Sequence, residues 1–276
     1  MTEPHVTEPP PEPEPASPKP GPLAGPGPRY LPSPIFIGLL VLTGLGAWLA
    51  GAEVGNPRVA VFVLVTAGWL VSLCLHEFGH ALVAYRAGDR SVADKGYLTL
   101  NPLRYTDAML SIVLPLAFLL IGGIGLPGGA VWIDRGRIRG RLRQSLVSAA
   151  GPLVNLALAV LLLVLVSRLS VALPGHDVLW AGLAFLAFLE VTATLINLIP
   201  LPGLDGFGII EPWLPRQVVA SVAGVGQFGF LALVLLLFIP RVGQAFFDAI
   251  YAFMQALGVE PLFVQLGLTL YRFWSA

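Results

Sequence analysis

The sequence predicts an all-α polytopic membrane protein, and three observations support this fold class. Hydrophobic residues make up 56% of the 276 residues, while charged residues make up 12%, about half their usual share in soluble domains. Several apolar runs approach or exceed the roughly 20 residues that a helix needs to cross a bilayer. The formal net charge is zero and the only cysteine is Cys74. A nucleic-acid partner and an internal disulfide framework are therefore not expected.

The chain divides into three parts by composition. Residues 1–33 are rich in Pro, Glu, Gly and Ala, and we expect a disordered tail, because such a segment buries too little apolar surface to offset its ordering entropy. The tail lacks the basic and apolar regions of a cleavable signal peptide. Residues 34–240 are expected to form a membrane-embedded domain with its core at 58–215. Residues 241–276 are expected to form amphipathic helices at the membrane interface.

About five or six transmembrane helices are expected. Apolar or helical runs occupy residues 35–51, 58–85, 146–167, 178–199 and 217–239. Between the second and third of these, the alternating segment 97–100 is bounded by Gly and Asn-Pro, which predicts a short strand or hairpin. An edge of this strand could pair with an extended peptide. A further apolar run, 109–126, is interrupted by Pro115 and a Gly pair.

The placement of Lys and Arg indicates whether the run 109–126 crosses the membrane. If it crosses, the two sides of the membrane carry nine and seven basic residues. If it enters and returns, they carry twelve and four, which is the bias expected between cytoplasmic and external loops. We therefore expect a re-entrant β-hairpin or loop before the helix at 146–167. This arrangement places the N-terminal tail in the cytoplasm of a multi-pass cell-membrane protein.

The pattern His76-Glu77-Phe78-Gly79-His80 lies late in the second apolar run. Histidines four apart on a helix are about 40° apart around its axis, so both rings face one point and can bind zinc. Glu77 is placed beside them to take a proton from an attacking water. His76 lies about 27 Å along a helix of roughly 42 Å, which places the site within the membrane.

A third metal ligand is required, and Asp205 is the leading candidate. It follows an apolar helix on a stiff turn that contains Pro200 and Pro202. The alternative is that Asp205 only forms the turn, and a site with a glutamate ligand would use Glu190 or Glu211. The remaining histidines, His5 and His176, lie in the tail and in a loop between helices.

Three motifs together resemble the signatures of the site-2 protease family, and they occur in the family's order. They are His76-Glu77-Phe78-Gly79-His80, Ala150-Gly151-Pro152-Leu153-Val154-Asn155 at the opening of a helix, and Asn197…Pro200…Asp205-Gly206. Residues 98–104 and Asp107 resemble a bacterial branch without a PDZ domain. The resemblance covers residues 58–215. The segment departs from the branch at Tyr105, Ala108 and 207–212, none of which is a ligand position.

The resemblance implies an intramembrane zinc metalloprotease with one zinc ion per chain. Zinc would be held by His76, His80 and Asp205, with Glu77 as the catalytic base. Asn155 and Asn197 would bind the substrate backbone or the oxyanion, although helix–helix hydrogen bonds are the alternative. The implied partners are the lipid bilayer and single-span membrane proteins such as anti-sigma factors. An inactive scaffold of the same fold, or a metal transporter, remains an alternative function.

Two further features have open interpretations. Glu190 is an acidic residue inside an apolar helix, which makes it a functional candidate, but a protonated or helix-paired structural group is equally compatible. Five arginines alternate between 135 and 143, and the simplest interpretation is a cytoplasmic anchor attracted to anionic lipid.

Overall fold

The fold is given by a computed structural model that describes residues 31–105, 131–224 and 235–275, together with residues 116, 117, 119, 120 and 233. Within these ranges the regular elements are helices and no strand occurs, which confirms the all-α class. The α-helices are α1 (Pro34–Gly51), α2 (Pro57–Ala87), α3 (Ser91–Asp94), α5 (Arg141–Ala172), α6 (Asp177–Leu198), α7 (Asp205–Ile210), α8 (Arg216–Ala223), α10 (Pro240–Ala256) and α11 (Pro261–Tyr271). The 3-10 helices are η1 (Tyr97–Thr99), η2 (Pro102–Arg104), η4 (Arg135–Arg137), η5 (Glu211–Trp213) and η6 (Phe273–Ser275).

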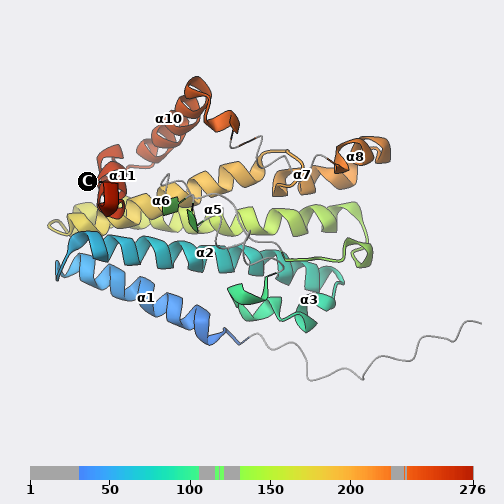
Figure 1. The fold of residues 1–276 in the computed structure, drawn as a ribbon, viewed down its shortest axis with the longest axis horizontal. Helices are drawn as coiled ribbons and strands as arrows, with labels where there is room; N and C mark the ends of the chain where they lie inside the picture. The colour runs from blue at the N-terminus through green and yellow to red at the C-terminus, as the bar shows by residue number, and fades with distance from the viewer. Residues whose placement is uncertain are drawn as a thin grey trace, which may run out of the picture.

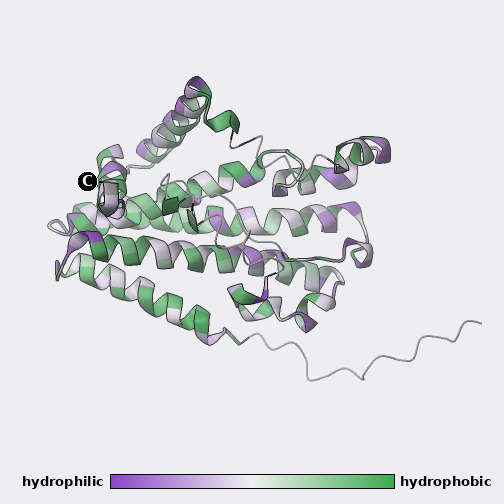
Figure 2. Ribbon diagram, in the orientation of Figure 1, coloured by the Kyte–Doolittle hydropathy of each residue, from purple (hydrophilic) through white to green (hydrophobic). Residues whose placement is uncertain are grey.

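Four of these helices, α1, α2, α5 and α6, are long and apolar enough to cross a membrane. The pair α10 and α11 qualifies as a fifth candidate if it counts as one span, although the two helices are bent by 120° at the break between them. Apolar residues cover most of the four long helices, and hydrophilic residues gather in the loops at their ends (Figure 2). Residues 225–232 and 234 of the helical run expected at 217–239 lie outside the described residues, and the described part before them belongs to α8, which ends at Ala223.

Local sequence signals set the starts of the first two long helices. Ser33 accepts a hydrogen bond from the backbone N–H of Phe36, and Asn56 accepts one from Arg58. In each case a proline follows the capping residue, at the first helical position, where its missing N–H is not needed. Gly88, with φ of 127°, ends α2. These caps explain why the observed bounds agree closely with the apolar runs.

Among the four long helices, α2 lies between α1 and α5 (Figure 1), and α6 packs against both α5 and α2. Small residues allow close approach: a Cβ atom on Gly46 of α1 would lie 2.5 Å from the backbone N of Leu64 in α2. The Leu64 side chain also contacts Gly182 of α6, so one leucine is enclosed by glycines from two helices. Such small-residue contacts are the usual way for helices to pack in membranes.

Helices α2 and α5 are antiparallel, and the segment that joins them returns to the end of α2 from which it leaves. Asp89 just after α2 accepts a hydrogen bond from the backbone N–H of Asp134, at 2.8 Å. Gly88 lies against the backbone carbonyl of Arg137, where a Cβ atom would be 2.9 Å away. This return agrees with an even number of crossings between the two helices. Most of the run 109–126 itself lies outside the described residues.

The prediction of a strand at residues 97–100 is wrong. Residues Tyr97–Thr99 form a 3-10 helix, and the flanking residues Gly96 and Leu100 have positive φ angles of 76° and 56°. The hydroxyl of Thr99 donates to the Gly96 carbonyl, while the Thr99 carbonyl accepts the backbone N–H of Ser33. Left-handed residues at both ends turn the chain, so the alternating pattern does not extend. This segment therefore offers no strand edge for a substrate.

Candidate metal centre

His76 and His80 lie on one face of α2 and their rings meet at their Nε2 atoms, which are 3.1 Å apart. Both side chains are buried, with 6% exposure each. The helix has 31 residues, or roughly 46 Å, and His76 is roughly 28 Å from its start. The two histidines therefore converge at the place that their spacing predicts.

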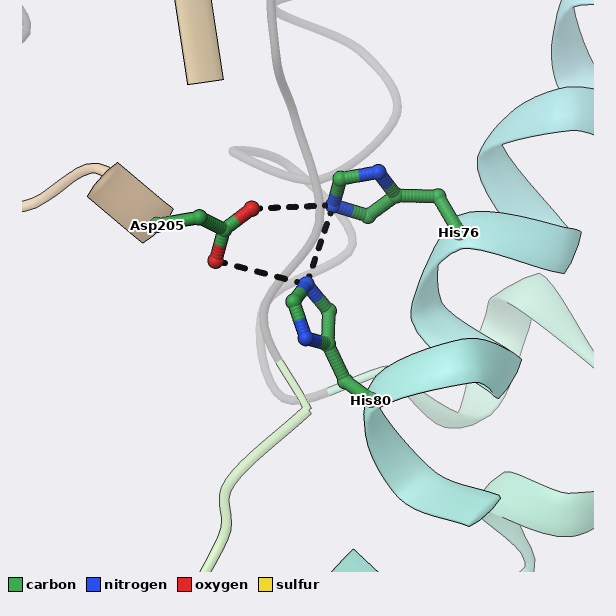
Figure 3. Close-up of side chains that lie close together, drawn as sticks. All are labelled: His76, His80 and Asp205. Atoms are coloured by element: carbon green, nitrogen blue, oxygen red, sulfur yellow. Dashed lines mark hydrogen bonds and ion pairs between the residues drawn. The ribbon is translucent and has the colours of Figure 1, made fainter. Parts of the chain in front are cut away.

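Asp205 is the first residue of α7 and reaches the two histidines from the end of α6. The chain turns tightly before it: Gly203 has φ of 97°, and a Cβ atom on Gly206 would lie 2.3 Å from the carbonyl oxygen of Leu198. Glycine at position 206 is thus required by geometry, because only glycine allows α7 to start against the end of α6. Asp205 is thereby directed towards α2 (Figure 3).

The three side chains have the spacing of a zinc site. Oδ2 of Asp205 lies 3.3 Å from Nε2 of His76, and Oδ1 lies 3.3 Å from Nε2 of His80. Bonds of about 2.0–2.1 Å at a tetrahedral angle place neighbouring zinc ligands roughly 3.3 Å apart. His76, His80 and Asp205 form the one group of three or more His, Cys, Asp or Glu residues in the described ranges that could hold a metal ion.

Gly151 of α5 leaves space for an ion beside these ligands. A Cβ atom on this residue would lie 2.3 Å from Nε2 of His80 and 2.5 Å from Nε2 of His76. The nitrogen atoms that would bind zinc therefore face a glycine that is the only residue small enough to fit there. Gly151 and Pro152 lie well inside α5, not at its opening as the sequence suggested, since the helix already begins at Arg141.

Outer hydrogen bonds fix the orientation of both imidazole rings. Nδ1 of His80 lies 2.7 Å from the carbonyl oxygen of Val147, and Nδ1 of His76 lies 2.5 Å from Oδ1 of Asn155. Because both oxygens can only accept, each Nδ1 carries the proton and each Nε2 keeps its lone pair. Histidines that bind zinc have this arrangement. The ring orientations thus fit the metal that the spacing of the ligands indicates.

Asp205 completes the set of donor atoms. Zinc binds the ionised carboxylate of aspartate and the neutral imidazole of histidine, which are the forms that Asp205, His76 and His80 would present to it.

Glu77 is buried beside the histidines, at 2% exposure. Its Oε2 accepts a hydrogen bond of 3.1 Å from the backbone N–H of Val131. This contact comes from the segment that precedes α5 and fixes the carboxylate at the same depth as the two rings. The arrangement places a proton acceptor next to the three candidate ligands.

The other candidate residues are not part of the group of three that could hold a metal ion. Nδ1 of His176 is paired with the carbonyl of Gly51, and Glu211 forms an ion pair of 3.6 Å with Arg135. Cys74 is fully buried. Asn197 is buried in the last turn of α6, and His5 lies outside the described residues.

Two further polar residues lie near the site: Glu190, whose interpretation was open from sequence, and Ser72, for which the sequence analysis gave no role. Glu190 of α6 accepts hydrogen bonds from Ser72 of α2 and from Asn155 of α5, so it lies behind the amide that contacts His76. The position of Ser72, four residues before His76 and on the same helix face, was a signal that could have found this cluster. The link to Asn155 depends on how α5 and α6 pack, which spacing within one helix does not show.

The fold and the site define a class of protein: a helical membrane protein with a His-Glu-x-x-His helix and a distant aspartate at one metal centre. The chain is 50% identical to a protein of Mycolicibacterium smegmatis named zinc metalloprotease Rip2, over 89% of this chain and 95% of the relative. It is 51% identical to the protein of the same name in Mycobacterium tuberculosis, over 88% of this chain and 95% of the relative. It is 35% identical to zinc metalloprotease YwhC of Bacillus subtilis, over 63% of this chain and 80% of the relative.

The chain therefore belongs to the site-2 protease family of zinc metalloproteases. No family model and no solved structure matches it. Membership in the family agrees with zinc as the metal of the His76, His80 and Asp205 cluster.

Proposed function

We propose that this zinc metalloprotease hydrolyses peptide bonds in or near the transmembrane segments of membrane proteins. The observation that carries the proposal is the position of the candidate metal cluster. His76 and His80 are buried in α2, which is long and apolar enough to cross a membrane and packs between α1 and α5. A site at this depth is reached by a substrate that is itself in the bilayer.

The proposed roles follow from the contacts at the site. His76, His80 and Asp205 hold zinc. When bound there, zinc supplies a Lewis acid that polarises the scissile carbonyl and activates the attacking water. Glu77 accepts the proton of that water and passes it to the leaving amine. General acid–base catalysis of this kind requires the carboxylate to lie within hydrogen-bond reach of the proton that it transfers. Its fixed position beside the histidines supports this role.

Asn155 and Asn197 remain the proposed contacts for substrate backbone or oxyanion. Asn197 is buried next to the turn that leads to Asp205, which supports a position close to the reacting bond. Asn155 bonds His76 in α2 and Glu190 in α6, which are helix–helix contacts of the kind considered as the alternative. We therefore give Asn197 the stronger claim to contact the substrate.

The proposed substrates are single-span membrane proteins, of which anti-sigma-factor-like proteins are one class, and the proposed surroundings are the cell membrane with the N-terminal tail in the cytoplasm. A transmembrane helix shields its own carbonyl groups, so the substrate must unwind at the scissile bond. Exposed Arg141 and Arg143 lie in the first turn of α5 and exposed Arg139 lies just before it, at the end of α2 near the metal centre. Their charge suits a cytoplasmic surface next to anionic lipid.

The experiment compares membrane proteomes of the host strain carrying either the wild-type protein or Glu77→Gln. Single-span proteins that accumulate in full-length form in the Glu77→Gln strain, and whose shortened forms end in or beside the apolar segment, support the proposal. Equal levels of all membrane proteins and their fragments in the two strains would contradict it.

A further inference from the structure

Glu190 is the most deeply buried acidic residue near the site that the proposed chemistry does not use, at 1% exposure. It lies in the middle of α6. Its Oε2 accepts one hydrogen bond of 2.7 Å from the hydroxyl of Ser72 and one of 3.0 Å from Nδ2 of Asn155. One carboxylate oxygen thus joins three helices, α2, α5 and α6, directly behind the candidate metal centre.

These hydrogen bonds continue to a proposed zinc ligand. Asn155 donates to Glu190 through Nδ2 and contacts Nδ1 of His76 through Oδ1. We propose that Glu190 is a positioning residue that acts through Asn155 to hold His76 in the tautomer and orientation that bind zinc. The inference rests on the ligand set of the proposed function.

An acceptor behind Asn155 is needed because the oxygen end and the NH₂ end of its amide have nearly the same shape. The Asn155 side chain can present either its oxygen or its NH₂ group to His76. If the NH₂ group faced His76, Nδ1 would have to accept, and the proton would move to Nε2, where it blocks zinc. Glu190 prevents this rotation because its Oε2 already accepts from the Asn155 nitrogen. The chain of contacts therefore selects one tautomer at the metal.

Ser72 forms its hydrogen bond with the carboxylate of Glu190 and not with the amide of Asn155. Its hydroxyl donates to the same Oε2 and it lies one helical turn before His76. Removal of Ser72 leaves the hydrogen bond between Glu190 and Asn155 in place. Ser72→Ala is therefore a matched control that loses one hydrogen bond to Glu190 without freeing Asn155.

The test is the affinity of the purified full-length protein for zinc, measured by competition with a chelator. Glu190→Met has a similar size but only a weakly accepting thioether, and we expect it to weaken zinc binding about 10- to 100-fold, the usual effect of losing an outer-shell partner. Glu190→Gln keeps an acceptor oxygen and should bind zinc nearly as well as wild type. Ser72→Ala should lie closer to wild type than Glu190→Met. Wild-type affinity in Glu190→Met, or equal losses in the Gln and Met variants, would overturn the proposal.

If Glu190→Met does not fold, a double variant tests whether the direction of the hydrogen bond to His76 controls zinc binding. When Asn155→Asp is combined with Glu190→Gln, the new carboxylate at position 155 accepts from His76. The new amide at position 190 donates to that carboxylate, so the direction of the hydrogen bond to His76 is kept. Zinc affinity near wild type supports the proposal, and a loss of about 10-fold or more contradicts it. Zinc affinity is measured without substrate, so a failure of the proposed intramembrane proteolysis would leave this result unaffected.

Discussion

Gly151 of α5 lies so close to His80 of α2 that a Cβ atom on residue 151 would be 2.3 Å from the ring Nε2. This separation is far shorter than any ordinary contact between a Cβ atom and a nitrogen atom. The Gly-Pro segment of α5 therefore brings the helix backbone against the candidate metal centre. The contact explains why the position opposite the two histidines has no side chain.

The first prediction concerns this contact. Gly151→Ala places a methyl group beside both Nε2 atoms, so we expect loss of most bound zinc and of proteolysis. Zinc per chain is measured in the purified protein by atomic emission. The matched control is Gly44→Ala in α1, where a Cβ atom meets nothing within 4 Å. Full zinc content in Gly151→Ala would show that the methyl group does not reach the metal.

The second prediction separates the base from the ligands. Glu77→Gln removes the proton acceptor but keeps the shape of the side chain and an acceptor for the Val131 N–H. We expect unchanged zinc content and thermal stability, with cleavage slowed about 10²- to 10⁴-fold. Zinc content, thermal stability and cleavage rate are measured on the same preparation. If cleavage continues at the wild-type rate, Glu77 is not the base.

The third prediction identifies the carboxylate ligand. Asp205→Ala should weaken zinc binding by more than the roughly 10- to 100-fold expected for an outer-shell partner, because it removes a ligand. Glu211→Ala should keep zinc, since Glu211 pairs with Arg135 and not with the histidines. Chelator competition on both variants makes the comparison. Greater zinc loss in Glu211→Ala than in Asp205→Ala would assign the site to another class of metalloprotease.

The fourth prediction concerns topology. In a Cys74→Ala background, single cysteines at Ser17, Arg139 and Leu173 are labelled with a reagent that does not cross the membrane. We expect Leu173→Cys to react with the reagent in intact cells. Ser17→Cys and Arg139→Cys are expected to react only after the membrane has been permeabilised. The reason is that residues 88 and 137 meet at one end of α2, while α5 leads away to residue 173. Labelling of Ser17→Cys and Arg139→Cys from opposite sides would rule out the re-entrant arrangement.

The sequence predicted the long helices well because their signals are local. Caps such as Ser33 and Asn56, each followed by proline, coincide with the starts of apolar runs. It failed at residues 97–100, where Tyr-Leu-Thr-Leu alternates as a strand would. The conformation there depends on Leu100, which has a positive φ, and on Ser33, which bonds Thr99 from far away in the chain. The alternation of residue types predicts neither the positive φ of Leu100 nor the hydrogen bond between Ser33 and Thr99.

In the candidate site too, local sequence signals predict some of the contacts and not others. The spacing of His76 and His80 predicts their convergence, and the prolines before Asp205 indicate a stiff turn. The close approach of Gly151 and the bond from Asn155 to Glu190 arise where α5 packs against α2 and α6. These contacts join residues that are far apart in sequence, so no pattern within one helix reveals them. The resemblance to a family supported the ligand set and singled out Asn155, but it did not indicate the contacts of Asn155 with His76 and Glu190.

The most direct test of the central claim is cleavage by the purified protein in lipid vesicles. A single-span protein found to accumulate in the Glu77→Gln strain is incorporated into the vesicles with the zinc-loaded enzyme, and the product ends are mapped by mass spectrometry. We predict cleavage within or at the edge of the apolar segment, lost with Glu77→Gln. Cleavage confined to the water-exposed parts of the substrate, or cleavage that persists with Glu77→Gln, would contradict the account.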